Sequence, residues 1–179
     1  LPTLWNADER FLQSYLKMFQ GFYFTADGGF RDDDGYVFVM GRVDDVINVA
    51  GHRLSTGEME EIIATHPDVA ECAVIGAGDS IKGQLPLGFV VLKAGANKNP
   101  EEMRRELEQL IRDEIGPIAC YKETAVVARL PKTRSGKILR GTMRKIADGE
   151  EVKVPSTIDD PAILDEIEEA LKKIGYAKK

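Results

Sequence analysis

The alternation of apolar and polar positions predicts several helices in the second part of the chain. A helix is expected at about 56–64, where Ser55 and Glu58 form a capping box and apolar side chains share one face. A second helix, at about 100–115, starts with a proline, which suits the first helical position, and carries one apolar stripe. A last amphipathic helix is expected at about 161–174.

Short apolar runs rich in β-branched residues predict the strands of one small sheet. The three runs are Val69–Gly76, Leu87–Leu92 and Thr124–Ala128. A glycine-containing loop over 76–83 joins the first two runs, and a short basic helix is expected at about 138–149. The sum is an α+β fold in which a small sheet of about three strands packs with helices.

Residues 1–43 depart from this pattern and predict the incomplete tail of a larger N-terminal domain. Helical spacing at 8–18 is followed by Asp-Gly turns and by the aromatic and β-branched run 36–40, which is a hairpin signal. We expect a separate C-terminal domain over 44–179. The chain begins at Leu1 and not at methionine, and we interpret it as a fragment.

Composition places the chain among soluble proteins with a real core. It has 179 residues, of which 43% are hydrophobic. Cys72 and Cys120 are too few for a disulfide framework, and we expect two free thiols. No apolar run approaches the ~20 residues of a membrane span, and no signal-peptide pattern opens the chain. We expect a cytoplasmic protein without a membrane partner, or a mitochondrial matrix protein if the source is eukaryotic.

Charge is unevenly distributed along the chain. The net charge of −6 argues against a general nucleic-acid binder. The segment 129–145 nevertheless holds basic residues and no acidic one, and its members are Arg129, Lys132, Arg134, Lys137, Arg140, Arg144 and Lys145. The segment is expected to meet an anion. A solvated basic face is the ordinary alternative, and a stand-alone module that docks an acidic partner through this segment stays open.

The first stretch with candidate chemistry is Gly41–Arg53. Gly51 allows backbone amides to approach a ligand closely, and Arg53 offers a planar fork of donors suited to phosphate. A glycine near an arginine is common by chance, so the stretch alone is equally consistent with a turn that carries a surface arginine.

The second stretch is Pro131–Lys137, a loop with three cations among small residues. It is not a P-loop, because Pro131 stands where the first glycine is required and Ile138 follows the lysine. We place Lys137 at the start of the basic helix. A lysine there can act as a point charge on a developing oxyanion or phosphate, worth on the order of 4 kcal/mol at about 4 Å and an effective dielectric near 20. An ordinary solvated lysine is the alternative.

Together the strings GRVDDVINVAGHRLS and LPKTRSGKI resemble signature segments of the adenylate-forming superfamily. The resemblance is to the AMP-forming short-chain acyl-CoA synthetases that act on acetate or propionate. It runs from about Tyr23 to the final helix and includes STIDDPA at 156–162. In that family a small C-terminal domain closes over a large N-terminal domain in two successive orientations, one forming acyl-adenylate and the other admitting coenzyme A.

The resemblance implies roles at the nucleotide. Asp27 would bind the ribose hydroxyls with help from Arg42, and Asp44 would be the hinge between the two orientations. Family members usually carry glycine where Ala26 stands. Lys137 would bridge the substrate carboxylate and the α-phosphate during adenylation, which makes it the catalytic residue; it would also be a candidate for regulatory acylation, which removes its charge.

The resemblance also implies a coenzyme A site. Ala50 and Gly51 would line the tunnel for coenzyme A, with Arg53 meeting phosphate of this substrate or of ATP. Arg112 would contact the nucleotide of coenzyme A. ATP with magnesium and coenzyme A are the implied substrates and cofactors, no residue of the chain is assigned to a metal, and the partner is the missing large domain. The isolated fragment is expected to be inactive.

Overall fold

Two units make up the computed structural model, which describes residues 3–177 without the side chains of Met40 and Asp44. The division between the units falls between Asp44 and Asp45. No helix in the described part of the chain is both long and apolar enough to cross a membrane.

The first unit consists of a helix and a β-hairpin. Helix α1 (Asp8–Tyr15) is followed by strands β1 (Asp27–Arg31) and β2 (Val37–Arg42), which pair in antiparallel fashion. In the hairpin Phe30 stacks on its cross-strand partner Phe38, with ring centroids 4.9 Å apart. The hairpin expected from the Asp-Gly turns is present. A 3-10 turn, η1 (Val43–Asp45), follows the hairpin.

The second unit is built on a five-stranded sheet in the order β4-β3-β6-β5, with β7 also paired to β6. β5 pairs with β6 along its length, so β3 and β7 share the opposite edge of β6 at different positions. The β6–β7 pair is parallel, whereas the other pairs of this sheet are antiparallel. The strands are β3 (Val46–Val49), β4 (His52–Ser55), β5 (Val69–Asp79), β6 (Gly83–Leu92) and β7 (Glu123–Val126).

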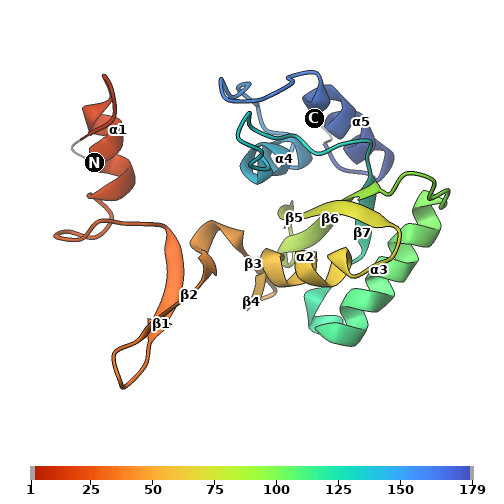
Figure 1. The fold of residues 1–179 in the computed structure, drawn as a ribbon, viewed down its shortest axis with the longest axis horizontal. Coiled ribbons are helices and arrows are strands. Elements are labelled where there is room, and N and C mark those ends of the chain that lie inside the picture. Colours follow the sequence, from red (N-terminus) through yellow and green to blue (C-terminus); the bar gives the residue numbers. More distant parts are fainter. Residues whose placement is uncertain (1–2, 178–179) are drawn as a thin grey trace. The chain divides into compact units, whose positions relative to one another are not determined.

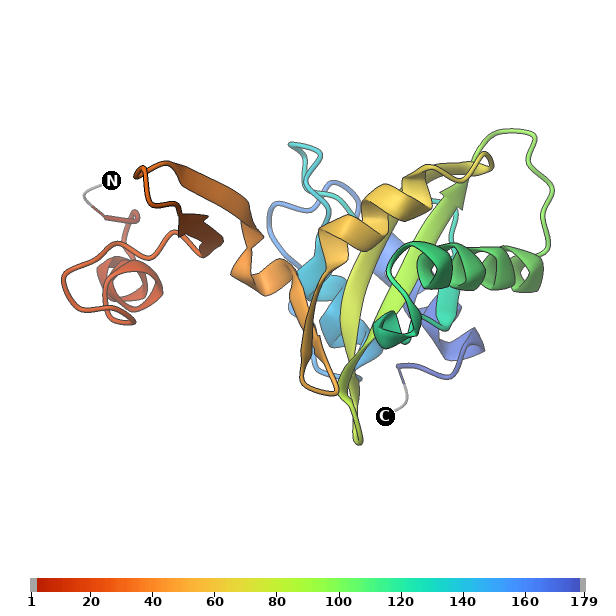
Figure 2. The same ribbon diagram turned by 90° about the horizontal axis from the view of Figure 1, so that it is seen from below.

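Helices cover both faces of this sheet, as Figures 1 and 2 show. On one face lie α2 (Thr56–Ala64) and α3 (Pro100–Glu114), and on the other lie α4 (Arg140–Ala147) and α5 (Ile163–Lys173). Another 3-10 turn, η2 (Pro117–Ala119), follows α3. Three layers therefore enclose two hydrophobic cores.

The two cores follow from the alternation of side chains along each strand. In β5, Val74 points into the core under α2 and α3, while Ala73 and Ile75 point into the core under α4 and α5. Met59 and Met143 are fully buried on opposite sides of the sheet. Each helix is thus held mainly by its apolar face rather than by intrinsic helix propensity.

The α+β class is confirmed, and the sheet is larger than the expected three strands. The hairpin β3–β4 joins the sheet at two points. Val49 pairs with Gly83 of β6, and Ala50 N–H donates to the carbonyl of Lys82, just before β6. The loop expected at 76–83 is mostly strand, since β5 and β6 pair as far as Asp79 and Gly83. Asp79 Oδ1 accepts the amide hydrogens of both Ile81 and Lys82, which closes the short turn that remains.

Candidate functional site

The loop that carries Lys137 is a short hairpin, which we call the lysine hairpin (residues 131–139). Thr133 N–H donates to the carbonyl of Lys137 at 2.8 Å, and Lys137 N–H donates to Thr133 Oγ1 at 3.1 Å. Gly136 turns the chain with φ of 84°, in the left-handed region that favours glycine. The placement of Lys137 at the start of a helix was wrong, because α4 begins three residues later at Arg140.

The side chain of Lys137 is exposed and forms no ion pair with any described side chain. Its neighbours in the basic segment behave differently. Lys132 lies 2.7 Å from a carboxylate oxygen of Glu71, and Arg129 pairs with two acids of the C-terminal region. Part of the positive charge of 129–145 is therefore neutralised within the fold, while the Lys137 ammonium stays available to a ligand.

Arg140, at the base of the lysine hairpin, forms a two-pronged ion pair with Glu60 of α2. The Nε and Nη2 atoms of Arg140 lie 2.9 and 2.6 Å from the two carboxylate oxygens. Glu60 also accepts the amide hydrogen of Val74 at the free edge of β5. Hydrogen bonding to Glu60 raises the pKa of Arg140. The pair ties the two helical layers together around the sheet edge, three residues along the chain from Lys137.

The Ala50-Gly51 stretch forms the turn between β3 and β4. Both residues have positive φ, 50° for Ala50 and 89° for Gly51, as two-residue hairpin turns require. A Cβ on Gly51 would meet no atom within 4 Å, so the backbone is open to a ligand. Arg53 is exposed on β4, two residues further on, and forms no ion pair with the described side chains.

A cavity of about 240 Å³ lies next to Lys82, in the turn between β5 and β6. Arg112 lines it together with Lys82 and Cys120. The carbonyl of Lys82 accepts the amide hydrogen of Ala50 at 2.8 Å, so the turn and the cavity are connected. The ammonium of Lys82 lies 3.2 Å from Cys120 Sγ. Lys82 thus links the Ala50-Gly51 turn to the cavity that Arg112 lines, and both features are expected at the same ligand.

Lys82 was not among the residues singled out from the sequence. A single lysine in a polar turn carries no signal of its own in one sequence. Its place beside Arg112 arises from the β5–β6 turn and from η2, which are distant in sequence. Only tertiary structure could identify it.

Asp27 and Arg42 are cross-strand partners in the hairpin of the first unit. Asp27 is exposed, and its amide hydrogen is accepted by Thr25 Oγ1 at 3.2 Å. Ala26, just before it, has φ of 63°, which explains why glycine is the usual residue of the resembled family at this place. The two residues expected at the ribose are therefore brought together.

Asp44 lies in η1, where the division between the two units falls. The side chain of Asp44 is outside the described part of the structure. The neighbouring Asp45 is held in the second unit, because its carbonyl accepts the hydroxyl of Thr56 at 2.8 Å. Asp44 is thus the last residue before a firmly bonded element, and its role as a hinge stays a prediction.

The lysine hairpin and the Ala50-Gly51 turn lie at opposite ends of the sheet. Lys132 pairs with Glu71 near the start of β5, whereas Lys82 follows the end of that strand at Asp79. Along β5, Glu71 and Asp79 are roughly 26 Å apart at about 3.3 Å per residue. Figure 2 shows the same separation, with the turns β3–β4 and β5–β6 together at one end. The second unit therefore presents two distinct candidate surfaces.

Comparison with known proteins gives a consistent result. Residues 58–137 match the family model described as the AMP-binding enzyme C-terminal domain. An uncharacterized protein of Pseudomonas aeruginosa is 61% identical over 170 residues, covering 95% of this chain and 27% of that protein. Acyl-CoA synthetase short-chain family member 3, mitochondrial, of Mus musculus is 47% identical over 170 residues, with coverage of 95% and 25%. Residues 58–137 of this chain belong to the AMP-binding enzyme C-terminal domain family.

Solved structures agree with this membership. ATP-bound MatB from Rhodopseudomonas palustris matches with a TM-score of 0.66 and 25% sequence identity, covering 82% of this chain and 28% of that one. The chain spans about a quarter of the length of the curated relatives above. The resemblance to short-chain acyl-CoA synthetases is confirmed at the level of the family.

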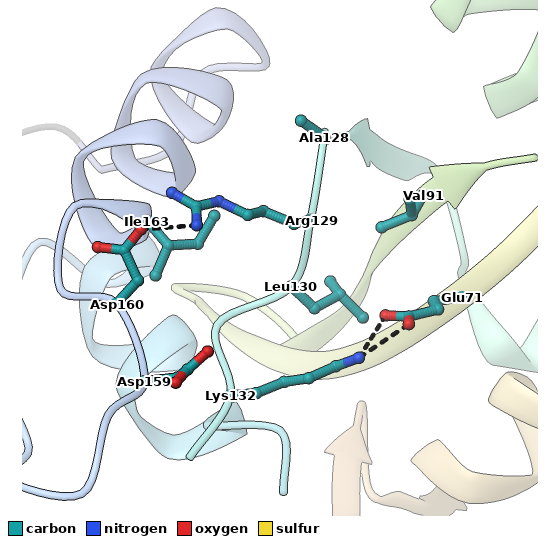
Figure 3. Close-up of a pocket in the computed structure, with 9 residues that line it drawn as sticks. All are labelled: Glu71, Val91, Ala128, Arg129, Leu130, Lys132, Asp159, Asp160 and Ile163. Atoms are coloured by element: carbon teal, nitrogen blue, oxygen red, sulfur yellow. Dashed lines mark hydrogen bonds and ion pairs between the residues drawn. The ribbon is translucent and has the colours of Figure 1, made fainter. Parts of the chain in front are cut away.

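In this AMP-binding C-terminal domain, a second cavity of about 250 Å³ lies behind the lysine hairpin (Figure 3). Arg129, just before the hairpin, and Lys132, in its first arm, reach into it, and Asp159 and Asp160 face them from the connection between α4 and α5. Hydrogen bonds from Arg129 and Ala162 N–H lower the pKa of Asp160. No group of three or more metal-ligating side chains occurs in the described part of the chain.

Proposed function

We propose that this chain is the C-terminal domain of an ATP-dependent, AMP-forming ligase that joins a short carboxylic acid, acetate or propionate, to coenzyme A. The observation that carries the proposal is the separation of Lys137, which has no ion-pair partner among the described side chains, from a cationic turn at the opposite end of the same sheet. A domain used in two orientations needs two such surfaces. The short-chain synthetase relative supports the choice of substrate class.

In the adenylation step, a carboxylate oxygen attacks the α-phosphorus of ATP, and pyrophosphate leaves with the electrons of the broken P–O bond. Both reactants are negatively charged, and their approach is opposed by repulsion. Lys137 lowers this repulsion by placing its ammonium between carboxylate and α-phosphate, a role that its exposure permits. Asp27 and Arg42 hold the ribose, and magnesium accompanies the phosphates of ATP. The same exposure leaves Lys137 open to acylation, which removes its charge.

In the second step, rotation about Asp44 replaces the lysine hairpin by the opposite end of the sheet. The thiol of coenzyme A attacks the acyl carbon of the adenylate, and AMP leaves. The open backbone at Gly51 gives room for the pantetheine arm, since nothing lies where a Cβ would be. Arg53, Arg112 and Lys82 supply cations for the phosphates of coenzyme A.

The surface of the first unit is evidence for a larger partner domain. Its described residues expose several large apolar side chains, with Trp5 at 92% and Phe22 at 73% of their full accessible area. The hairpin adds Tyr36, Val37 and Val39, all about 70% exposed. Apolar groups gathered in this way are typical of surfaces that other protein covers. We propose that the large nucleotide-binding domain of the same enzyme covers them and that the isolated chain does not turn over.

The proposal is tested by separating the two half-reactions in the full-length enzyme. Lys137→Ala is expected to lower acyl-adenylate formation on the order of 10²-fold, because a pre-positioned charge is lost, while thioester formation from supplied adenylate is retained. Release of pyrophosphate and formation of acyl-CoA are the two measurements. Lys145→Ala, which removes another exposed lysine of the basic segment, serves as control and leaves both steps unchanged. Equal loss of both half-reactions in Lys137→Ala would refute the assignment.

A further inference from the structure

The lysine hairpin is bonded along its backbone to a segment that follows α4. We call residues 150–162, between α4 and α5, the strap. Arg134 N–H donates to the carbonyl of Thr157, and Asp159 N–H donates to the carbonyl of Lys132, both at 3.0 Å. Thr133 and Ile158 form an antiparallel bridge between these two bonds. The strap therefore acts as a third strand beside the two arms of the hairpin.

The strap is itself fixed to the domain at this point. Ile158 is buried in the core under α4 and α5, with 4% of its side chain exposed. Arg129 donates to Asp160 at 2.6 Å and to Glu166 of α5 at 2.8 Å, which joins the strap to the chain entering the hairpin. Figure 3 shows Asp160 facing Arg129 in this way.

Apart from the hydrogen bonds between its own two arms, the hairpin has little else to hold its tip. Residues 134–137 are exposed, so side-chain packing does not fix them. A lysine side chain on an unsupported loop samples many orientations, and each must be lost when the charge is placed between two reactants. Lys132 and Arg140 anchor only the two bases of the hairpin. The strap supplies the remaining restraint, at the arm opposite Lys137.

We propose that the backbone of strap residues 157–159 positions Lys137 for the adenylation half-reaction. This inference rests on the proposed function, which assigns that half-reaction to Lys137. The strap lies outside residues 58–137, which match the family model. Thr157, Ile158 and Asp159 are positioning residues and do not touch substrate.

The test changes one backbone donor at a single position in the full-length enzyme. Asp159→Pro removes the N–H that bonds to Lys132, while Asp159→Ala keeps it and serves as the matched control. Ile158 lies in a β-bridge, the extended conformation that a residue before proline prefers. The side chain of Asp159 is exposed and bonds to no described residue, so its loss alone is expected to be silent.

We expect Asp159→Pro to lower pyrophosphate release roughly tenfold, the consequence of about one lost hydrogen bond in the competent state. Thioester formation from supplied adenylate stays within about twofold, and Asp159→Ala matches the unchanged enzyme. A merely structural role would lower both half-reactions together, and that result overturns the inference. Equal adenylation by the two variants also overturns it.

A second variant keeps the inference testable if Asp159→Pro folds poorly. Arg129→Gln releases the strap at a half-exposed ion pair and is expected to lower adenylation selectively, with recovery in Arg129→Lys. An unaffected Arg129→Gln enzyme, with Asp159→Pro misfolded, counts against the strap. Lys137→Ala, measured in parallel, separates the two proposals. Full adenylation activity in Lys137→Ala would refute the proposed function. Full adenylation activity in the strap variants alone would refute only this inference.

Discussion

At the scale of single residues, cations that are close together in the sequence have different roles. Lys132 is held by Glu71, and Arg140 is held by Glu60, so both serve the fold. Lys137 is exposed to solvent without a described ion-pair partner. The sequence singled out Lys137 through its motif, but the pairing of its neighbours depends on acids of β5 and α2, which no local pattern connects to the loop.

The need for glycine at position 88 becomes visible only in the packing of the core. A Cβ at this position would lie 1.8 Å from the hydroxyl oxygen of Tyr121, which is buried and hydrogen-bonded to Thr124. We expect Gly88→Ala to destabilise the chain by about 1–3 kcal/mol, because the tyrosine must move out of a closely packed core. Thermal unfolding measures the loss.

Gly141→Ala is the matched control for this substitution. Gly141 lies in α4, and a Cβ there meets no atom within 4 Å. We expect no loss, or a gain of up to about 1 kcal/mol from helix propensity. Equal melting temperatures of the two variants would contradict the close contact between Gly88 and Tyr121.

At the scale of elements, the ion pair between Glu60 and Arg140 joins α2 to α4 around the edge of β5. We expect Glu60→Gln to destabilise the chain by about 2 kcal/mol, since it leaves a half-buried guanidinium with weaker partners. Arg140→Met in the same background should cost less than it does alone. A double-mutant cycle by urea unfolding measures this coupling, and strict additivity would show that the pair does not join the layers.

Several elements were predictable because their signals are local. The capping box placed α2 at Thr56–Ala64, and Ser55 Oγ accepts the amide hydrogen of Glu58 as that motif requires. The proline at the start of α3 and the stop before Gly116 were equally clear. The length of β5 was underestimated, because Gly76 resembles a loop residue. Packing explains the glycine at position 76, since a Cβ there would lie 2.4 Å from Cγ2 of Ile47.

At the scale of the whole second unit, charge pairs between distant segments add a dependence on pH. The carboxylate of Glu106 in α3 contacts Lys98, and it lies 2.9 Å from His66 Nε2. Hydrogen bonds from Lys98 and then from His66 lower the pKa of Glu106 below its ordinary value of 4.5. Because the folded pKa is lowered, the stabilisation is present above the unfolded pKa and is lost as the pH falls through the folded one.

We therefore expect the melting temperature of the chain to fall as the pH drops below about 4.5, by a modest amount because the Glu106 side chain is partly exposed. Hydrogen bonding to Arg104 lowers the pKa of Glu101 to about 2, so this carboxylate extends the decline in melting temperature toward pH 2. Glu106→Gln should lower the melting temperature at neutral pH and flatten the curve below about pH 4.5. Parallel curves for the two proteins would show that this carboxylate does not contribute.

The sequence by itself determined the α+β class, the hairpin of the first unit, most helix bounds and the motif that carries Lys137. These features depend on capping, turn chemistry and side-chain periodicity, which act over a few residues. The sequence also identified Lys137, Arg53, Arg112 and the Ala50-Gly51 turn one by one, but not how they are arranged in space.

Tertiary structure alone decided the five-stranded sheet, the two ends that present Lys137 and Gly51, and the contact between Lys82 and the cavity at Arg112. It also placed the strap against the lysine hairpin. The physical reason is that these contacts join segments far apart in the chain, whose backbone hydrogen bonds and ion pairs form only after the two cores have brought them together.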